Sequence, residues 1–184
     1  MPFEIPTNWR WTYLGDLLSN TSGLAYKKEN LDVKSEKPIR VLRGGNIEEG
    51  IWFTKDDDVM IAPQFVNDEL FLRKGTFITP AVTSLEKIGK TALIEEDLSD
   101  VVVGGFVLIL HPYYKENTLL RYMLYFFQSA YYKSVCKGIT NKSGQAFYNL
   151  SRAKLMKCYV PIPPKSELER ITKRIDGLFE HIAK

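Results

Sequence analysis

The chain has 184 residues, of which 45% are hydrophobic and 26% charged, and its formal net charge is +3. These values fit one globular domain and exclude a disordered chain. Two cysteines (Cys136, Cys158) and two distant histidines (His111, His181) exclude a zinc finger, a histidine metal cluster and a disulfide framework, so we expect a reducing, cytoplasmic setting without a metal. No signal peptide is expected, and the apolar run 101–110 is too short to cross a membrane as a helix.

Up to residue 112 the sequence favours strands over helices. The exception is a short helix expected near 14–18, where leucines stand at helical spacing. Residues 20–37 are polar and predict a loop, and the pair Gly44-Gly45 predicts a bulge or a close backbone approach. Apolar runs predict strands at 39–41, 47–53, 76–79, 91–94 and 101–110, the last as a buried strand pair or one kinked strand.

From residue 117 the sequence becomes helical. A helix over 117–131 is apolar nearly all round, which predicts packing in the core, although its aromatic residues could instead stack on bases. A polar loop is expected over 138–149, followed by a short helix that ends at 157 and an extended run over 158–162. The chain therefore divides into a strand-rich part and a helical part.

The last segment carries the clearest local helix signal. After Pro163-Pro164, Ser166 and Glu169 have the spacing of a capping box. Apolar residues then follow at spacings of 3, 4, 3 and 4, as in the seam of a coiled coil, over about two heptads. Either this helix docks on its own domain, or it begins a longer coiled coil with a partner helix. The seam consists of Leu168, Ile171, Ile175, Leu178 and Ile182.

Positive charge is concentrated between residues 121 and 157, a stretch that includes the polar loop 138–149. Amide side chains in that loop can pair with adenine edges, and Lys or Arg can pair with phosphates or guanine. The loop is therefore a candidate for contacting duplex DNA, with a solvated basic loop as the alternative. The stretch has no Asp or Glu and seven basic residues, namely Arg121, Lys133, Lys137, Lys142, Arg152, Lys154 and Lys157.

Motifs for catalysis or cofactor binding are absent from the sequence. It has no G-x-S-x-G nucleophile motif, no dinucleotide or S-adenosylmethionine loop, and no Asn- or Asp-Pro-Pro-Tyr/Phe motif of amino-methyltransferases. The adjacent carboxylates of Asp56, Asp57 and Asp58 could bind a cation, but consecutive side chains point in different directions, so we expect a solvated turn. We therefore expect a non-catalytic protein without a cofactor.

Six segments in order carry a resemblance to a known family. They are IPTNWRWTYLGDL, VLRGGNI, KGTFITPAVTSLEKIGKTALI, GGFVLIL, SGQAFYNLS and VPIPPKSELERITKRID. The chain resembles one target-recognition domain, with the beginning of the conserved helix, of the specificity (S) subunit of type I restriction–modification systems. It departs from the family at Glu167-Leu168-Glu169, where Glu-Gln is usual, and in length, because family members typically carry two such domains and two spacer helices.

The resemblance implies an α+β fold, with a mixed twisted β-sheet, flanking helices and a C-terminal coiled-coil spacer helix, as in the target-recognition domain of adenine methyltransferases. Residues 1–163 would form the recognition domain and residues 164–184 the start of the spacer helix. Such a domain reads one half of a bipartite site on double-stranded DNA. The implied partners are the modification (methyltransferase) subunits, the restriction subunits, and a second recognition domain or a homodimer held through the terminal helix. No cofactor and no membrane are implied.

Two groups of residues are the expected DNA contacts. Structural roles remain the alternative for several of them, since Asn149 or Ser151 can cap a helix, Arg43 can lie on a sheet surface, and Gln145 can hold its loop together. The expected phosphate contacts are Lys27, Lys87, Lys90, Lys133, Lys137, Lys142, Arg152 and Lys154. The expected base contacts are Arg43, Asn46, Ser84, Asn141, Ser143, Gln145, Tyr148 and Asn149.

Two other functions stay open at this point. One is the recognition domain of a fused restriction–methylation enzyme, which would be revealed by catalytic motifs elsewhere in the parent gene. The other is a protein-interaction module that associates through the terminal helix and binds no DNA. That module would keep all of its binding when the charges between residues 133 and 157 are reversed.

Overall fold

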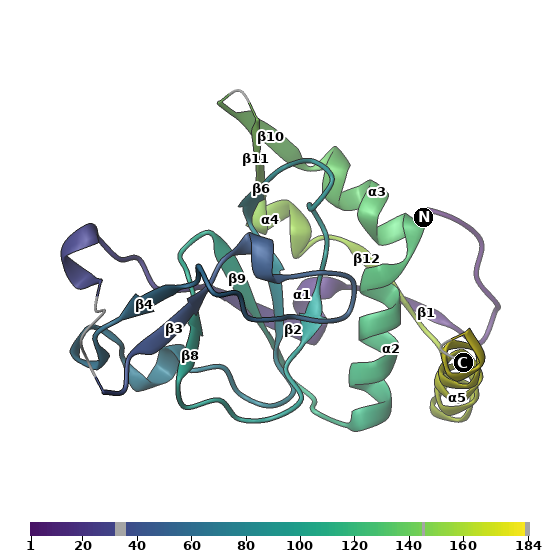
Figure 1. The fold of residues 1–184 in the computed structure, drawn as a ribbon. Coiled ribbons are helices and arrows are strands. Elements are labelled where there is room, and N and C mark those ends of the chain that lie inside the picture. The colour runs from purple at the N-terminus through teal and green to yellow at the C-terminus, as the bar shows by residue number, and fades with distance from the viewer. Residues whose placement is uncertain (32–35, 145, 183–184) are drawn as a thin grey trace.

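The computed structural model of the chain describes residues 1–31, 36–144 and 146–182, and Figure 1 shows how they are arranged. The central sheet has four antiparallel strands in the order β2 (Leu18–Ser22), β9 (Val107–Pro112), β5 (Phe77–Pro80) and β7 (Ala92–Leu93). The strands expected at 76–79 and 91–94 are confirmed as the antiparallel pair β5–β7. Most of β9 is buried, which explains its continuous apolar run.

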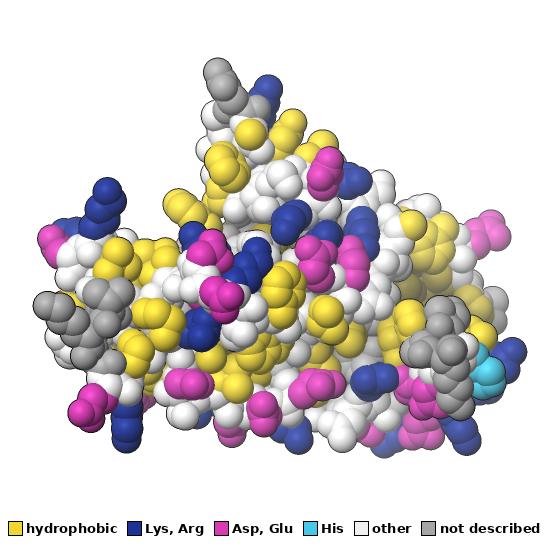
Figure 2. All heavy atoms as spheres, in the orientation of Figure 1, with side chains coloured by type: hydrophobic (Ala, Val, Ile, Leu, Met, Phe, Trp, Pro, Cys, Tyr) yellow, Lys and Arg dark blue, Asp and Glu magenta, His cyan; other side chains and the backbone are white. Residues whose placement is uncertain are grey.

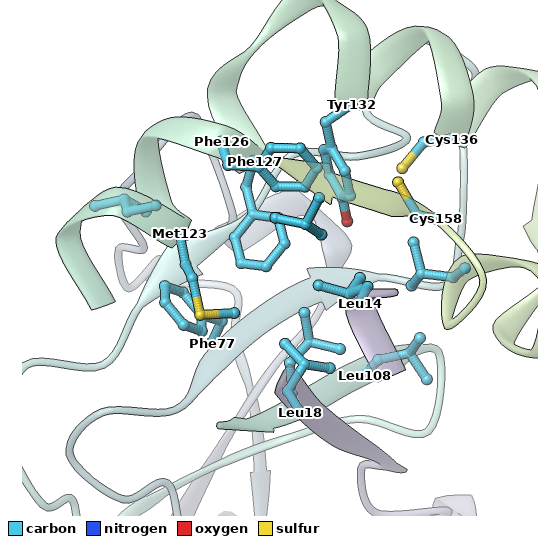
Figure 3. Packing of buried hydrophobic residues seen from close by; sticks show 14 of the residues in the cluster. Leu14, Leu18, Phe77, Leu108, Met123, Phe126, Phe127, Tyr132, Cys136 and Cys158 are labelled. Atoms are coloured by element: carbon cyan, nitrogen blue, oxygen red, sulfur yellow. The ribbon is translucent and has the colours of Figure 1, made fainter. Parts of the chain in front are cut away.

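Alternate residues of the central sheet enter two hydrophobic clusters. Phe77, Leu108 and Leu110 belong to the first cluster, which the helices cover (Figure 3). Their sequence neighbours Ile78 and Ile109 belong to the second. This alternation is the two-residue period of a strand, and it means that both faces of the sheet are packed.

A second, mixed sheet lies beside the central one (Figure 1). Its order is β4 (Val59–Ile61), β3 (Ile39–Leu42) and β8 (Val101–Val103), with β3 antiparallel to β4 and parallel to β8. The run 101–110 thus forms two buried strands, β8 and β9, but they belong to different sheets and do not pair with each other. The chain turns between them at Gly105-Phe106, where the N–H of Val107 donates to the carbonyl of Gly104 at 2.9 Å.

The strand expected at 47–53 is not formed. A turn of 3₁₀ helix at Gly44–Asn46 precedes it, and Ile47 and Trp52 then meet in a single isolated bridge. The backbone N–H of Phe53 donates to the carbonyl of Asn46 at 3.0 Å, so this segment is folded as a tight loop on itself. Only four residues lie between Ile47 and Trp52, and the segment forms no regular ladder with itself.

The helix expected over 117–131 is in fact two helices, α2 (Asn117–Gln128) and α3 (Ala130–Gly138). Ser129 separates them because its backbone is extended and its hydroxyl accepts a hydrogen bond from the N–H of Tyr132 at 3.2 Å, which caps α3. Phe126 and Phe127 are buried against the central sheet (Figure 3). Core packing of this apolar stretch is confirmed, so these two rings are not available to stack on bases.

The segment expected as a polar loop over 138–149 is a β-hairpin, which we call the hairpin. It consists of β10 (Thr140–Ser143) and β11 (Phe147–Leu150), and β11 also pairs with β6 (Val82–Thr83). The hairpin projects from the body of the domain (Figure 1). The sequence does not predict these strands, because most of their residues are exposed and show no apolar alternation. Pairing with β6 anchors it instead.

Short elements complete the domain. The helix expected near 14–18 is confirmed as α1 (Leu14–Leu17), between β1 (Arg10–Tyr13) and β2. α4 (Arg152–Leu155) follows the hairpin, and the hydroxyl of its N-cap Ser151 accepts from the N–H of Lys154 at 3.4 Å. The extended run at 158–162 is β12 (Tyr159–Ile162), which pairs with β1 and joins the two ends of the domain.

The terminal helix α5 (Lys165–Ile182) begins one residue before the predicted capping box. The carbonyl of Pro164 accepts from the N–H groups of Glu167 and Leu168 at 3.0 and 2.9 Å, so Ser166 is inside the helix and cannot cap it. The Trp9 indole donates to the Glu167 carboxylate at 2.5 Å, which ties the start of α5 to the N-terminal segment. The capping-box prediction is therefore wrong.

α5 packs on α2, and its buried face is rotated from the predicted seam. Leu168 and Thr172 are buried, and Asp176 pairs with Arg121 and Tyr125 of α2. Within the seam, Ile171 and Ile175 are half-buried and Leu178 is 50% exposed. The side chain of Ile182 lies outside the described residues. α5 thus docks on its own domain and leaves an apolar edge uncovered near its end.

The observed class is α+β with mixed pairing and flanking helices, which confirms the expected fold class. Within the described ranges, no helix combines the length and the apolar character that crossing a membrane would require.

Candidate nucleic-acid interface

A cleft of about 780 Å³ opens beside the hairpin, where the ends of β3 and β8 face it. Because β3 and β8 are parallel, their C-terminal ends lie at the same edge of the sheet, which brings Arg43 and Gly104 to one place. No Asp or Glu lines this cleft in the described part of the chain, and we call it the basic cleft. Its lining is Leu24, Ala25, Tyr26, Arg43, Gly44, Gly45, Asn46, Lys55, Val82, Thr83, Gly104, Gly105, Phe106, Val107 and Phe147.

The glycine pair forms part of the cleft wall. A Cβ atom on Gly44 would lie 3.3 Å from the Cβ of Pro80, and one on Gly45 would lie 3.2 Å from the Nζ of Lys55. The predicted close backbone approach is therefore confirmed at Gly44. Glycine at this position lets the turn after β3 lie directly against β5.

Asn46 holds this turn from beneath. Its side-chain oxygen accepts from the N–H of Arg43 at 2.8 Å, and its amide donates to the carbonyl of Phe53 at 3.1 Å and to the Asp58 carboxylate at 2.6 Å. The residue is only 1% exposed. The expectation that Asn46 contacts a base does not fit this geometry, because every polar atom of its side chain is already bonded inside the protein.

Asp58 is the centre of the same buried network. Its carboxylate also accepts from the Arg40 guanidinium at 3.0 Å and from the N–H of Lys55 at 2.7 Å. Burial raises the pKa of Asp58, but the hydrogen bonds from Lys55, Asn46 and Arg40 outweigh burial and lower the pKa below its usual value. The expected solvated turn is thus wrong for Asp58, whereas Asp56 and Asp57 are exposed.

The hairpin presents polar side chains at the rim of the basic cleft. Asn141, Ser143 and Asn149 are exposed and Tyr148 is half-buried, while Gln145 lies outside the described residues. Asn141 and Asn149 are directly opposite each other in the ladder, so their amides emerge on the same face of the ribbon. The hairpin therefore carries several side chains able to contact base edges without rearrangement.

Four exposed cations near the hairpin have no acidic partner among the described residues. In the described part of the chain no ion pair involves Lys137, Lys142, Arg152 or Lys154, and all four are exposed. Across the cleft, Lys27 is exposed and only 3.6 Å from the equally exposed Glu29, a weak pair. Figure 2 shows basic side chains near the hairpin tip and on the opposite lobe, with hydrophobic side chains between them.

Three other predicted phosphate contacts are paired within the protein. Lys87 and Lys90 both bind Glu48, Lys87 at 3.5 Å, and Lys133 binds Glu49. The hydrogen bond from Lys90 lowers the pKa of Glu48. These pairs link the loop after β3 to the segment before β7 and to α3. None of the three lysines lines the basic cleft, and neither does half-buried Ser84.

A second hollow, of about 620 Å³, lies where α2 and the end of α5 meet the loop 49–52. Carboxylates line it, and within the described residues Glu95 and Glu96 form no ion pair. We call it the acidic groove. Its negative charge disfavours a nucleic acid. Its lining is Glu49, Gly50, Ile51, Trp52, Leu93, Ile94, Glu95, Glu96, Arg121, Leu124, Tyr125, Gln128 and Phe179.

Sequence reasoning missed several residues that line the basic cleft. The sequence predicts that Phe106 belongs to the buried run 101–110, and it does not place Phe147, Tyr26 or Lys55 among the expected contacts. Phe106 is 70% exposed and Phe147 is 57% exposed. The glycine pair before Phe106 was the available signal, since two glycines inside an apolar run favour a turn, and a turn would expose the next side chain.

Known proteins share the fold of this chain. Residues 6–184 match the model of the type I restriction modification DNA specificity domain, and the chain belongs to that family. It is 28% identical over 185 residues to the type I restriction enzyme EcoAI specificity subunit of Escherichia coli, covering 97% of this chain and 30% of that protein. It is 25% identical over 181 residues to a protein of Methanocaldococcus jannaschii named as the type I restriction enzyme MjaX specificity subunit, covering 92% and 39%.

Solved structures support the same fold. The HsdS subunit of Thermoanaerobacter tengcongensis aligns with a TM-score of 0.62 at 17% identity, over 98% of this chain and 40% of that one. A chain from a type I R-M system aligns at 0.68 and 17% identity, over 98% and 40%. The type IIG restriction endonuclease BpuSI aligns at 0.58 and 9% identity, over 90% and 26%. The chain therefore spans less than half the length of each of these proteins.

Proposed function

We propose that this chain binds duplex DNA in the basic cleft and reads one half of a bipartite target for a type I restriction–modification complex. The observation that carries the proposal is a cleft that, among the described residues, is lined by no carboxylate and flanked by cations without an ion pair, beside a polar hairpin, in a member of the DNA specificity family. A two-stranded ribbon has the width to enter the major groove, where the four base pairs are distinguishable. Binding, not catalysis, is the role of the chain.

The proposed contacts divide by chemistry. Exposed lysines and arginines on either side of the cleft, of which Lys27 forms only a weak pair with Glu29, neutralise phosphates and give an affinity that falls with salt. Amides, hydroxyls and Arg43 contact base edges. The proposed phosphate contacts are Lys27, Lys137, Lys142, Arg152 and Lys154, and the proposed base contacts are Arg43, Asn141, Ser143, Gln145, Tyr148 and Asn149. The proposal assigns no direct DNA contact to four of the expected residues, because they do not line the basic cleft. They are Lys87, Lys90, Lys133 and Ser84.

The terminal helix would connect the domain to its partners. In this proposal residues 1–163 recognise DNA and residues 164–184 begin the spacer helix. The exposed edge of α5 near Leu178 would then meet a second recognition domain or a second copy. Modification and restriction subunits, in the cytoplasm, would supply the cofactors and the chemistry.

The test is selection of bound sequences from randomised duplex DNA, with the domain alone and with a modification subunit. Recovery of one short asymmetric motif is expected. The variant Lys137→Glu/Lys142→Glu should bind that motif on the order of 100-fold more weakly, because it removes two phosphate contacts and adds two repulsive charges. Lys173→Glu is the matched control, since Lys173 is an exposed lysine on α5, and it should bind as the unchanged protein does.

Two outcomes would count against this function. A folded protein that enriches no motif under either condition is not a recognition domain. Equal binding by Lys137→Glu/Lys142→Glu and by Lys173→Glu would place the DNA elsewhere, or favour a protein-interaction module that associates through α5.

A further inference from the structure

We propose that Phe106 and Phe147 together contact the C5-methyl group of a thymine in the major groove, so that the recognised half-site contains an essential thymine. This inference rests on the proposed function, since it assumes that DNA occupies the basic cleft. It adds a chemical requirement that the polar contacts cannot supply.

The two rings are exposed side chains on different elements that line one cleft. Phe106 is at the turn between β8 and β9, and Phe147 begins β11. Their side chains remain 70% and 57% exposed, which is unfavourable for rings of this size in water. Figure 2 shows hydrophobic side chains along the hairpin and in the hollow beside it. Exposed apolar surface within a basic cleft indicates a contact with an apolar part of an otherwise anionic ligand.

Both rings are presented by rigid backbone. The carbonyl of Phe106 accepts from the N–H groups of Ala81 and Val82 at 2.8 and 3.2 Å. On the hairpin, Asn149 is opposite Val82 in the ladder, two residues beyond Phe147. The short segment 81–83 therefore fixes the turn and the hairpin relative to each other before any ligand binds. Such preorganisation lowers the entropy cost of binding.

The chemistry of the rings selects the ligand group. A phenyl ring has no donor or acceptor, so it cannot pair with the polar edge of guanine, adenine or cytosine. The one apolar group that an unmodified base pair presents in the major groove is the C5-methyl of thymine. The hairpin ribbon fits the major groove better than the narrower minor groove, which makes a methyl contact the favoured mode over insertion of a ring between base pairs from the minor groove.

The experiment starts from the motif that the selection yields. Each thymine is replaced in turn by deoxyuridine, which removes the methyl group and leaves the base-pairing edge unchanged. With the unchanged protein, we expect one position at which binding weakens about fourfold, the loss typical of one buried methyl group. With Phe106→Ala/Phe147→Ala, binding of the thymine duplex should weaken and the difference between thymine and deoxyuridine at that position should disappear.

Phe65→Ala is the matched control. Phe65 is 44% exposed and does not line the basic cleft, so this variant should keep both the affinity and the deoxyuridine effect. Thermal unfolding of all variants checks that they are folded, which is expected because the replaced rings are largely exposed.

Three results would overturn the inference while leaving DNA recognition intact. They are a motif without thymine, a motif whose binding is indifferent to every deoxyuridine replacement, and a deoxyuridine effect that persists unchanged in Phe106→Ala/Phe147→Ala. Failure to enrich any motif would instead contradict the proposed function itself.

Discussion

The basic cleft and the acidic groove are hollows of similar size with opposite charge. Their volumes are about 780 and 620 Å³, and aromatic side chains line both. Arg43 and Lys55 line the first, whereas Glu49, Glu95 and Glu96 line the second. Size and the presence of aromatic side chains therefore do not distinguish them. The sign of the local charge does, because DNA is a polyanion and its binding depends on neutralising phosphates.

The comparison also shows why counting lysines in the sequence is insufficient. Lys133 belongs to the basic stretch, but it pairs with Glu49, a residue on the edge of the acidic groove. Lys142, nine residues further along the chain, has no acidic partner among the described residues and is exposed. Two lysines of one stretch thus have different environments. Only the second is free to contact a phosphate without losing an internal ion pair.

The largest effect is expected from the network beneath the basic cleft. Asn46→Ala should lower the free energy of unfolding by about 3 kcal/mol, since it removes one of the three donors to the buried Asp58 carboxylate and the side-chain partners of the Arg43 N–H and the Phe53 carbonyl. Asn141→Ala, at an exposed amide of the hairpin, should change it by less than about 0.5 kcal/mol. Urea denaturation measures both. An unchanged stability in Asn46→Ala, with DNA binding lost, would show that Asn46 contacts a base after all.

A smaller effect, on DNA affinity and its dependence on salt, should distinguish lysines that form ion pairs from lysines that do not. Lys142→Ala is expected to weaken DNA binding about fivefold and to reduce the slope of log affinity against log salt by about one, as for one lost phosphate contact. Lys87→Ala/Lys90→Ala should leave that slope unchanged, because both lysines already bind Glu48. Titrations at several salt concentrations give the slopes. A slope reduced by about two in the double variant would mean that these ion pairs break when DNA binds.

The smallest effect is expected on the stability of the fold at acid pH. The pKa of Asp58 is lower in the folded protein than the ordinary value of 3.8, so its ionised form stabilises the fold above that value. This contribution is fully present at neutral pH and is lost as the pH falls below about 4 towards the folded pKa. Asp58→Asn should therefore flatten the acid side of the stability curve in urea denaturation, whereas Asp56→Asn, at an exposed carboxylate, should not. Identical curves for the two variants would contradict the buried network.

Part of the candidate site could be predicted from residue types alone. The glycine pair at Gly44-Gly45 gave the close approach, and the concentration of positive charge between residues 121 and 157 includes the unpaired cations beside the hairpin. The role of Asn46 could not be predicted. An asparagine in a glycine-rich turn looks available to a ligand, and only the approach of Asp58 and Phe53 from elsewhere in the loop shows that its amide is occupied.

The hairpin and the helices also include features that could be predicted from the sequence and features that could not. Ser129 interrupts an otherwise continuous apolar stretch, and its capping hydrogen bond is local, so the break between the two helices could be predicted from the sequence. The hairpin strands could not be predicted, because their residues are mostly polar and exposed, and the pairing of β11 with β6 joins residues far apart in the chain. Likewise, the apolar spacing in α5 predicted a packed stripe, but the position of α2 decided which side of the helix was buried.

The sequence by itself determined the α+β class, the buried strands, the terminal helix and the family resemblance, since each depends on local spacing or on segments read in order. The tertiary structure alone decided which lysines are unpaired, which amide is buried, and that Phe106 and Phe147 line one cleft. The physical reason is that charge pairing, burial and shared surface depend on distances between residues remote in the chain. Composition and periodicity carry no information about those distances.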